Sequence, residues 1–141
     1  MADDDEAKVL AANEAFYAAF DAGDAAAMAA LWAEKAPVVC VHPGWDPLHG
    51  RAAVVAAWHG ILDSGRSPRV RAEDARAVVW GDVAAVVCVE RIVPRRGVGQ
   101  GLLAATNVFV REDGAWRVAH HHASPVSRDR EPEPPPPGAL N

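Results

Sequence analysis

The chain is poor in cysteine and has no long hydrophobic run. Its two cysteines, Cys40 and Cys88, lie far apart in the apolar stretches PVVCV and AAVVCVE. This placement is typical of buried free thiols rather than of a disulfide framework or a metal site. No apolar run approaches the ~20 residues that a membrane-spanning helix needs, and the opening MADDDEAKVL lacks the basic start and apolar centre of a secretory signal. These absences predict a cytoplasmic protein with no membrane partner.

Basic residues are also scarce. Lys and Arg number 14 against 19 Asp and Glu, a formal net charge of -5, which argues against binding nucleic acid by neutralising phosphates. At 141 residues the chain is long enough for one domain with a core and too short for two ordinary ones. We therefore expect its partners to be a small-molecule ligand or a second copy of the chain, with no nucleic acid.

The hydrophobic pattern changes period along the chain. Apolar residues recur first at helical spacing and later at the alternating spacing of strands. The pattern predicts helices over residues 3–23, 24–36 and 51–64, a short strand over 37–42 after the second helix, and strands over 69–79, 83–93, 102–111 and 115–124. PGWDPLHG at 43–50 predicts a loop, and Asp113-Gly114 a hairpin turn. Helices gathered on one side of an antiparallel meander define an α+β fold.

Two segments rich in proline or glycine carry no such pattern. Residues 127–141, SRDREPEPPPPGALN, have the composition of an extended, solvated chain. We therefore expect one domain over residues 1–126 and a disordered tail over 127–141. PRRGVGQG at 94–101 is followed by no helix and contains no Gly-Lys-Ser, so it predicts a flexible hairpin loop and not a phosphate site.

Three motifs carry a family resemblance. ANEAFYAAFDAGDAAAMAALWAE, HGRAAVVAAW and NVFVREDGAWRVAHHHASP, in this order, resemble the nuclear transport factor 2-like superfamily, specifically its bacterial SnoaL-like members. The resemblance covers residues 8–126. It implies a cone-shaped fold in which three N-terminal helices pack on a curved, mainly antiparallel sheet around an apolar pocket. The activity stays open, because this superfold hosts isomerases, dehydratases, cyclases, epoxide hydrolases and domains without chemistry.

The run His120-His121-His122 lies on the last predicted strand, where successive side chains point to opposite faces. Counting from the hairpin turn places Phe109 opposite Val118 and Asn107 opposite His120. Asn107, Trp116, His120 and His122 then share the face that looks toward the helices and the pocket. His121 falls on the other face.

The other face of the predicted sheet is made of small, largely apolar residues. It carries Arg117, Ala119, His121, Ala123, Ala104, Thr106, Val108, Val83, Ala85, Val87 and Val89. Such a face is poorly suited to water, and the three helices can cover only one side of the sheet. We therefore expect a homodimer through the sheet face, which the resemblance also implies.

His120 and His122 admit three interpretations. A metal site would need a further ligand from His42, His49 or Glu90. A histidine on a half-buried strand can also simply pack with its hydrogen bonds satisfied. We favour contact with a ligand in the pocket, and we predict neither a metal nor a cofactor.

His42 is the candidate general base. It ends the strand before Pro43, and in the similar ketosteroid isomerases a strand ending before proline carries the aspartate that moves the proton. An imidazole with a pKa near ~6.5 suits general-base work at neutral pH. Asn107 or Tyr17 could donate to a developing enolate, although Phe16 stands at the position of the tyrosine of those isomerases. The alternative is that His42 only bonds the loop backbone.

The sequence thus predicts a pocket protein of the SnoaL-like type. The leading hypothesis is a cofactor-independent isomerase, dehydratase-like lyase, cyclase or hydrolase that acts on a small apolar metabolite. The alternative is a non-enzymatic ligand-binding or dimerisation domain. The expected catalytic residues are His42, His122 and Asn107, and the expected ligand-binding residues are Tyr17, Trp32, Trp45, Trp58, Glu90, Phe109, Trp116 and His120.

Overall fold

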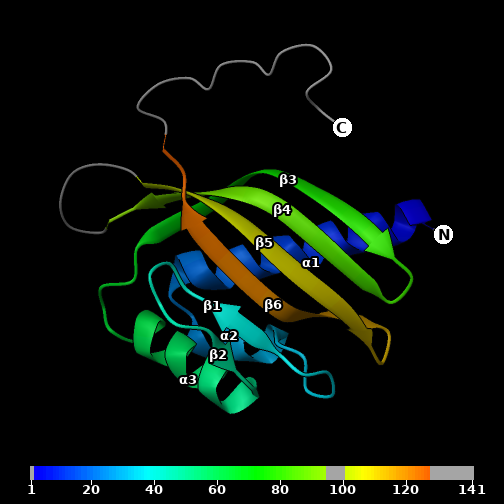
Figure 1. Cartoon of the computed structure of the whole chain (residues 1–141), viewed down its shortest axis with the longest axis horizontal. Coiled ribbons are helices and arrows are strands. Elements are labelled where there is room, and N and C mark those ends of the chain that lie inside the picture. The colour runs from blue at the N-terminus through cyan, green and yellow to red at the C-terminus, as the bar shows by residue number, and fades with distance from the viewer. Residues whose placement is uncertain (1, 95–100, 128–141) are drawn as a thin grey trace, which may run out of the picture.

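The computed structural model describes residues 2–94 and 101–127. It contains three helices, α1 (Ala2–Ala22), α2 (Ala25–Leu31) and α3 (Arg51–Leu62), and six strands (Figure 1). The strands are β1 (Val39–Val41), β2 (Leu48–His49), β3 (Arg69–Trp80), β4 (Val83–Val93), β5 (Gly101–Glu112) and β6 (Ala115–Pro125). The three expected helices and the five expected strands are all present. The expected disordered tail, apart from Ser127, and most of the 94–101 loop lie outside the described residues.

The helix boundaries follow from local chemistry. Gly23 ends α1 with a backbone φ of 66°, a conformation that glycine adopts without the steric cost of a Cβ atom. Asp24 then caps α2, because its side chain accepts a hydrogen bond from the backbone N–H of Ala27 at 3.0 Å. The short link between the two helices turns the chain back so that both pack on the same side of the sheet.

The six strands form one sheet in the order β2-β1-β6-β5-β4-β3, in which only β1 and β6 run parallel. The helices lie against one face of this sheet, with α1 running behind β3, β4 and β5 (Figure 1). This architecture is the α+β cone that the sequence predicts. The loop expected at 43–50 contains one unexpected element, the two-residue strand β2, whose Leu48 pairs with Cys40.

The register of the last hairpin differs from the expected one at a single point. Phe109 lies opposite Val118, as expected, but Val108 pairs with His120 and Asn107 with His121. Ala119 therefore has no partner on β5 and forms a β-bulge. Because one extra residue reverses the alternation of side chains, His121 points into the core and His120 and His122 point outward. The predicted pairing of Asn107 with His120, and the predicted faces of all three histidines, are wrong.

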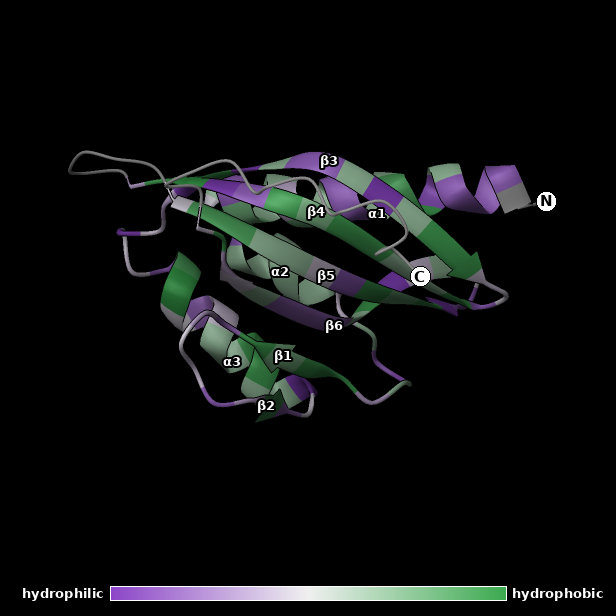
Figure 2. Cartoon of the chain, turned by 45° about the horizontal axis from the view of Figure 1, so that its top comes forward, coloured by the Kyte–Doolittle hydropathy of each residue, from purple (hydrophilic) through white to green (hydrophobic). Residues whose placement is uncertain are grey.

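The outer face of the sheet is apolar over β3 and β4. Val78, Trp80, Val83 and Val87 are all exposed there, and Figure 2 shows hydrophobic residues along β4 and at the end of β3. The inward side chains of β4 alternate with them and are buried, among them Val86 and Cys88. Within the described residues, no helix is both long and apolar enough to cross a membrane.

Candidate functional site

Most of the buried polar side chains gather at one place in the core. Asn13 and Tyr17 come from α1, Glu90 from β4, Asn107 from β5 and His121 from β6, and each is at most 4% exposed. Four of them, Tyr17, Glu90, Asn107 and His121, form what we call the polar ring. Its members are supplied by four different elements, so the fold itself assembles this group.

Short hydrogen bonds connect the polar ring. The Tyr17 hydroxyl donates to Oε2 of Glu90 at 2.6 Å, and Nδ2 of Asn107 donates to Tyr17 Oη at 3.1 Å. Nδ1 of His121 lies 2.6 Å from Oδ1 of Asn107, and Nε2 of His121 faces Oε2 of Glu90 at 3.8 Å. Outside the ring, Asn13 accepts from Nδ2 of Asn107 at 2.9 Å, and the Cys88 thiol donates to Tyr17 Oη at 3.4 Å.

The contacts of Asn107 fix the tautomer of His121. Because Nδ2 of Asn107 donates to both Asn13 and Tyr17, the Oδ1 atom that faces His121 must accept. Nδ1 of His121 therefore carries the proton and donates it. In the neutral ring, Nε2 is left with a lone pair directed at Glu90.

His42 lies beside the polar ring, directly after β1. It is 4% exposed, and its ring centre is 6.1 Å from that of His121 and 4.7 Å from that of Trp58. Nε2 of His42 contacts the Cys40 thiol at 3.6 Å, while the backbone carbonyl of His42 accepts a hydrogen bond from the Trp45 N–H. The imidazole therefore points into the core and not to the loop backbone.

Burial shifts the ionisable groups of the site in opposite directions, since it disfavours every charged form. It lowers the pKa of His42 to about 4 and that of His121 to about 3, so both rings are neutral at pH 7. It raises the pKa of Glu90 to about 7, although the Tyr17 hydrogen bond acts against the rise. The carboxyl group, and neither histidine, is thus the group that titrates near neutrality.

The walls of the site are aromatic. Trp58 of α3 is fully buried and packs edge-on against Phe16, Phe20 and His42. Trp45, whose ring centre is 5.0 Å from that of His42, is 47% exposed and covers this histidine from the solvent side. Trp45 and Trp58, like Tyr17 of the polar ring, are thus expected ligand-binding residues that lie at the site.

Three other expected ligand-binding residues are buried in the core, and the contacts of one of them, Trp116, place it away from the polar ring. Trp32 forms an isolated bridge with Val118. Trp116 lies under the guanidinium of Arg111, and this guanidinium is paired with Asp5 of α1. Asp5 lies about 18 Å from Tyr17 along α1, at the rise per residue of an α-helix. Phe109, the third, is fully buried in the same hydrophobic core.

His120 and His122 lie on the outer face of the sheet. They line a pocket of about 380 Å³ together with Val87, Ala104, Ala105, Thr106 and Ser124. Nδ1 of His120 is 2.9 Å from the backbone carbonyl of Val39. The sheet separates both residues from Glu90 and His42, and no cluster of three His, Cys, Asp or Glu side chains suited to a metal ion occurs in the described part of the chain.

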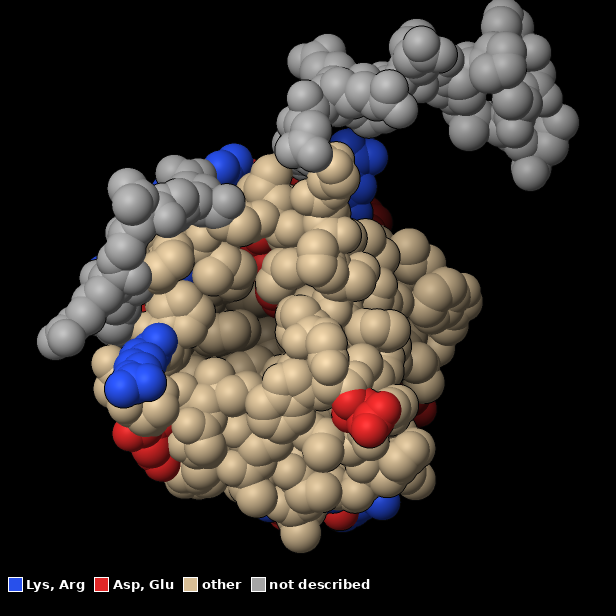
Figure 3. Space-filling view, turned by 60° about the vertical axis from the view of Figure 1, so that its left-hand side comes forward, with Lys and Arg blue, Asp and Glu red and all other residues tan. Residues whose placement is uncertain are grey.

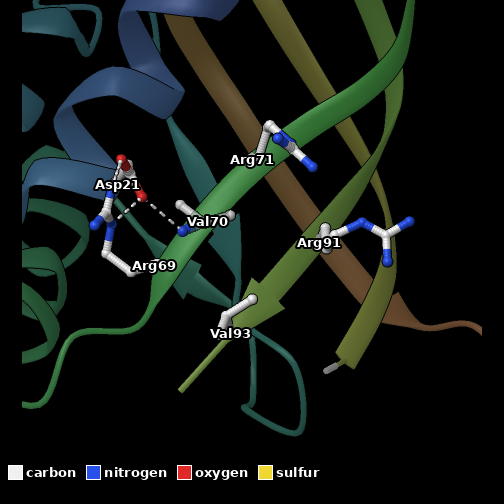
Figure 4. A pocket seen from close by; sticks show the side chains of 6 residues that line it. All are labelled: Asp21, Arg69, Val70, Arg71, Arg91 and Val93. Atoms are coloured by element: carbon white, nitrogen blue, oxygen red, sulfur yellow. Dashed lines mark hydrogen bonds and ion pairs between the residues drawn. The ribbon is translucent and has the colours of Figure 1, made fainter. Parts of the chain in front are cut away.

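A second pocket, of about 330 Å³, lies where β3 begins and β4 ends (Figure 4). Asp21 holds Arg69 there through two hydrogen bonds, at 2.8 and 3.0 Å, and also accepts from the backbone N–H of Val70. Arg71 and Arg91 point away from this pair in Figure 4.

In the space-filling view, the surface is hollowed near its centre, and an acidic side chain is visible inside the hollow (Figure 3).

Sequence reasoning missed two members of the site. Asn13 lies within the buried stripe of α1, one turn before Tyr17, so a polar residue in an apolar stripe was the available signal. The alternation rule predicts the wrong face for His121, because nothing in the local sequence marks the bulge at Ala119.

The fold and the site together define a class of protein. A cone of three helices on a curved sheet, with polar side chains inside an aromatic core, is the nuclear transport factor 2-like fold, a family with members that bind small-molecule ligands. The family model of the SnoaL-like domain matches residues 9–128, and the chain belongs to this family.

Similar structures agree with this assignment. One is a "putative dehydratase from the NTF2-like family" of Streptomyces avermitilis, with 36% identity and a TM-score of 0.83 over 90% of this chain and 99% of that one. Another is a "putative calcium/calmodulin-dependent protein kinase type II association domain" of Thiobacillus denitrificans, with 35% identity and a TM-score of 0.74 over 83% of this chain and 94% of that one.

A curated sequence relative is the F-box protein SKIP8 of Arabidopsis thaliana. It is 25% identical over 116 residues, which make up 82% of this chain and 48% of the relative. The chain thus spans about half the length of this relative.

Proposed function

We propose that the protein is an enzyme that moves a proton next to a carbonyl group in a small, largely apolar molecule, with His42 as the general base. The observation that carries the proposal is the position of His42, a buried neutral imidazole that faces the polar ring across 6.1 Å and lies under Trp45. An imidazole accepts a proton only in its neutral form, and burial, which lowers the pKa of His42 to about 4, keeps the ring neutral at pH 7 while making it a weaker base than a free histidine.

The polar ring beside His42 is built from hydrogen-bonding groups. Negative charge that develops on a carbonyl oxygen is stabilised by preorganised polar groups in a site that excludes water. His121 and Asn107, rather than the expected His122, take this role in the proposal. Aromatic walls at Phe16 and Trp58 favour an apolar substrate.

A lyase or isomerase step fits this arrangement best. Both reactions begin with removal of a proton from the carbon next to a carbonyl, which needs one base and one stabilised oxygen. The 36% identity with the dehydratase-like protein of Streptomyces avermitilis, over nearly all of that chain, supports a dehydration in particular. Neither step requires a bound cofactor.

Replacing His42 with alanine is expected to abolish proton exchange. The wild-type protein should speed the loss of deuterium from α-deuterated cyclohexanone and cyclopentanone, followed by proton NMR, because His42 would remove the label. His42→Ala should return the rate to that of buffer, a loss of roughly 100-fold or more for removal of a general base. His122→Ala is the matched control and should exchange like wild type, since His122 lies on the outer face. Equal exchange by the wild type and His42→Ala would refute the proposal.

The second candidate is a binding domain without chemistry. It is favoured by the likeness to the association domain of Thiobacillus denitrificans at 35% identity and by tight packing of Trp58 against His42 and Phe16. The exchange experiment separates the two candidates. Ketone binding that shifts the tryptophan fluorescence of the protein, with no exchange above buffer, would favour the binding domain.

We also propose that the protein forms a homodimer through the outer face of the sheet. Val78, Trp80, Val83 and Val87 expose a continuous apolar area on β3 and β4, and contiguous exposed apolar surface of this kind marks an interaction site. A second copy would cover the same face by two-fold symmetry.

Placing a charge in this face should separate the copies. Val87 is 54% exposed near the middle of the sheet, so Val87→Glu would bury a carboxylate in the interface and shift the species seen by equilibrium sedimentation from dimer to monomer at micromolar concentration. Trp45→Ser removes an equally exposed apolar side chain from the loop after β1 and should leave the dimer intact. A wild-type protein that sediments as a monomer would remove the proposal.

A further inference from the structure

The polar ring contains an unusual pair, a buried carboxyl group that faces a buried neutral imidazole. Glu90 is 1% exposed and so is His121. Buried carboxylates are ordinarily held by a cation or by two or three N–H donors. In the described part of the chain no lysine or arginine pairs with Glu90, and the hydroxyl of Tyr17 is the donor that reaches it.

We propose that Glu90 and His121 hold one transferable proton inside the site, which rests on the Glu90 carboxyl and has Nε2 of His121 as its acceptor. This proton pair rests on the function proposed above and adds a proton donor to the site, beside the general base His42. It also names the ligand class that would draw the proton across, a molecule bearing an oxyanion, such as an enolate or a phenolate.

The geometry of His121 makes it the acceptor. Its Nδ1 already donates to Asn107, so the only lone pair of the ring is on Nε2, which lies 3.8 Å from Oε2 of Glu90. A shift of less than 1 Å brings these atoms to hydrogen-bonding distance. On transfer, the O–H bond of Glu90 breaks and an N–H bond forms on His121, so one proton moves and no other reactant is needed.

The surroundings keep the proton on Glu90 until an anion arrives. The groups that face the pair are the Tyr17 hydroxyl from α1, the Cys88 thiol from β4, the Asn107 amide from β5, and Cys40 and His42 from β1 and the residue after it; the flanking His120 and His122, on the outer face of β6, act on His121 only through space. The groups that face the pair are all uncharged at neutral pH when Glu90 is protonated. Transfer would therefore create a buried carboxylate–imidazolium pair, which desolvation disfavours unless a bound oxyanion further stabilises the imidazolium.

Glu90→Gln is a closely matched variant. Glutamine keeps the size of the side chain, its oxygen can still accept from Tyr17, and its amide can still donate toward His121, but it has no proton to transfer. The hydrogen-bonded polar ring is thereby preserved while the proposed function of Glu90 is removed.

Nitrogen-15 NMR of the histidine rings, without any ligand, tests the shared proton. In the wild type we expect His121 to stay neutral with its proton on Nδ1, and its Nε2 signal to move in one step near pH 7 as Glu90 ionises. Glu90→Gln should remove this step, and His122→Gln, on the outer face, should keep it. A missing step in the wild type, or a step that persists in Glu90→Gln, overturns the proposal.

A titration with 4-nitrophenolate tests the ligand class. Calorimetry in two buffers of different ionisation enthalpy should show uptake of about one proton per bound anion above pH 7 in the wild type and none in Glu90→Gln. Absence of binding, or equal uptake by both proteins, refutes the oxyanion ligand. The NMR experiment involves no substrate, so it tests the proton pair separately from the proposed enzymatic function. If the NMR step is present but exchange does not depend on His42, the proposed function is refuted and the proton pair stands.

Discussion

Replacing Trp58 with alanine is expected to lower the free energy of unfolding by about 3–5 kcal/mol, the range for truncating a large aromatic side chain in a core. Trp58 is fully buried and contacts Phe16, Phe20, His42 and His121. It therefore joins α3 to α1 and to both buried histidines. Its removal would leave a cavity between the helices and the sheet, where the surrounding rings can collapse only in part.

Urea unfolding followed by circular dichroism measures this loss, and Trp45→Ala is the control. Trp45 is 47% exposed in the loop after β1 and packs on a single ring, that of His42, so its truncation should cost clearly less than that of Trp58. Similar costs for the two variants would show that Trp58 does not join the helices to the sheet as the structure indicates.

The helices and the long strands of this fold could be predicted from the sequence for a simple physical reason. Helix and strand periods differ, and nearly every element of this chain buries one face, so the spacing of apolar residues reveals both type and length. β2 escaped prediction because two residues cannot display a period. Leu48 and His49 become a strand only by pairing with β1, a contact that no local pattern records.

The site was harder to predict than the fold, because it depends on one residue of register. Val118 and His121 are three positions apart and yet both point inward, since Ala119 bulges out of the pairing with β5. A strict alternation would place His120 and His122 in the core. Glu90 and Tyr17 did not depend on that register, and the structure places both at the centre of the polar ring.

The opposite pKa shifts of the site predict how stability varies with pH. His42 and His121 have lowered pKa values in the folded state, so below pH 6.5 the unfolded chain binds more protons and stability falls as the pH drops. Glu90 has a raised pKa, so between pH 4.5 and about 7 the folded chain binds the extra proton, and this group destabilises the fold increasingly as the pH rises. The two histidines outweigh Glu90 below about pH 7, so the most stable pH should lie near 7.

Glu90→Gln isolates the contribution of the carboxyl group. A rise in the pKa of Glu90 from 4.5 to about 7 corresponds to roughly 3 kcal/mol of stability lost between the two ends of that range. Glutamine does not ionise, so the stability of Glu90→Gln relative to the wild type should increase by about this amount from pH 4 to pH 8, measured by urea unfolding at each pH. The comparison across pH cancels any constant effect of the substitution on packing.

Glu73→Gln is expected to show the opposite sign and provides the control. Glu73 accepts from Arg91 at 2.7 and 3.1 Å, and this hydrogen-bonded guanidinium lowers the pKa of its carboxyl group. Its ionised form therefore stabilises the fold, and Glu73→Gln should lose stability relative to the wild type as the pH rises from 4 to 8. The two carboxyl groups lie close together on paired strands, β3 and β4, but on opposite faces of the sheet. If the stability difference between Glu90→Gln and the wild type did not change with pH, Glu90 would titrate like an exposed carboxyl group. The opposite pH trends expected for Glu90→Gln and Glu73→Gln would then not be observed.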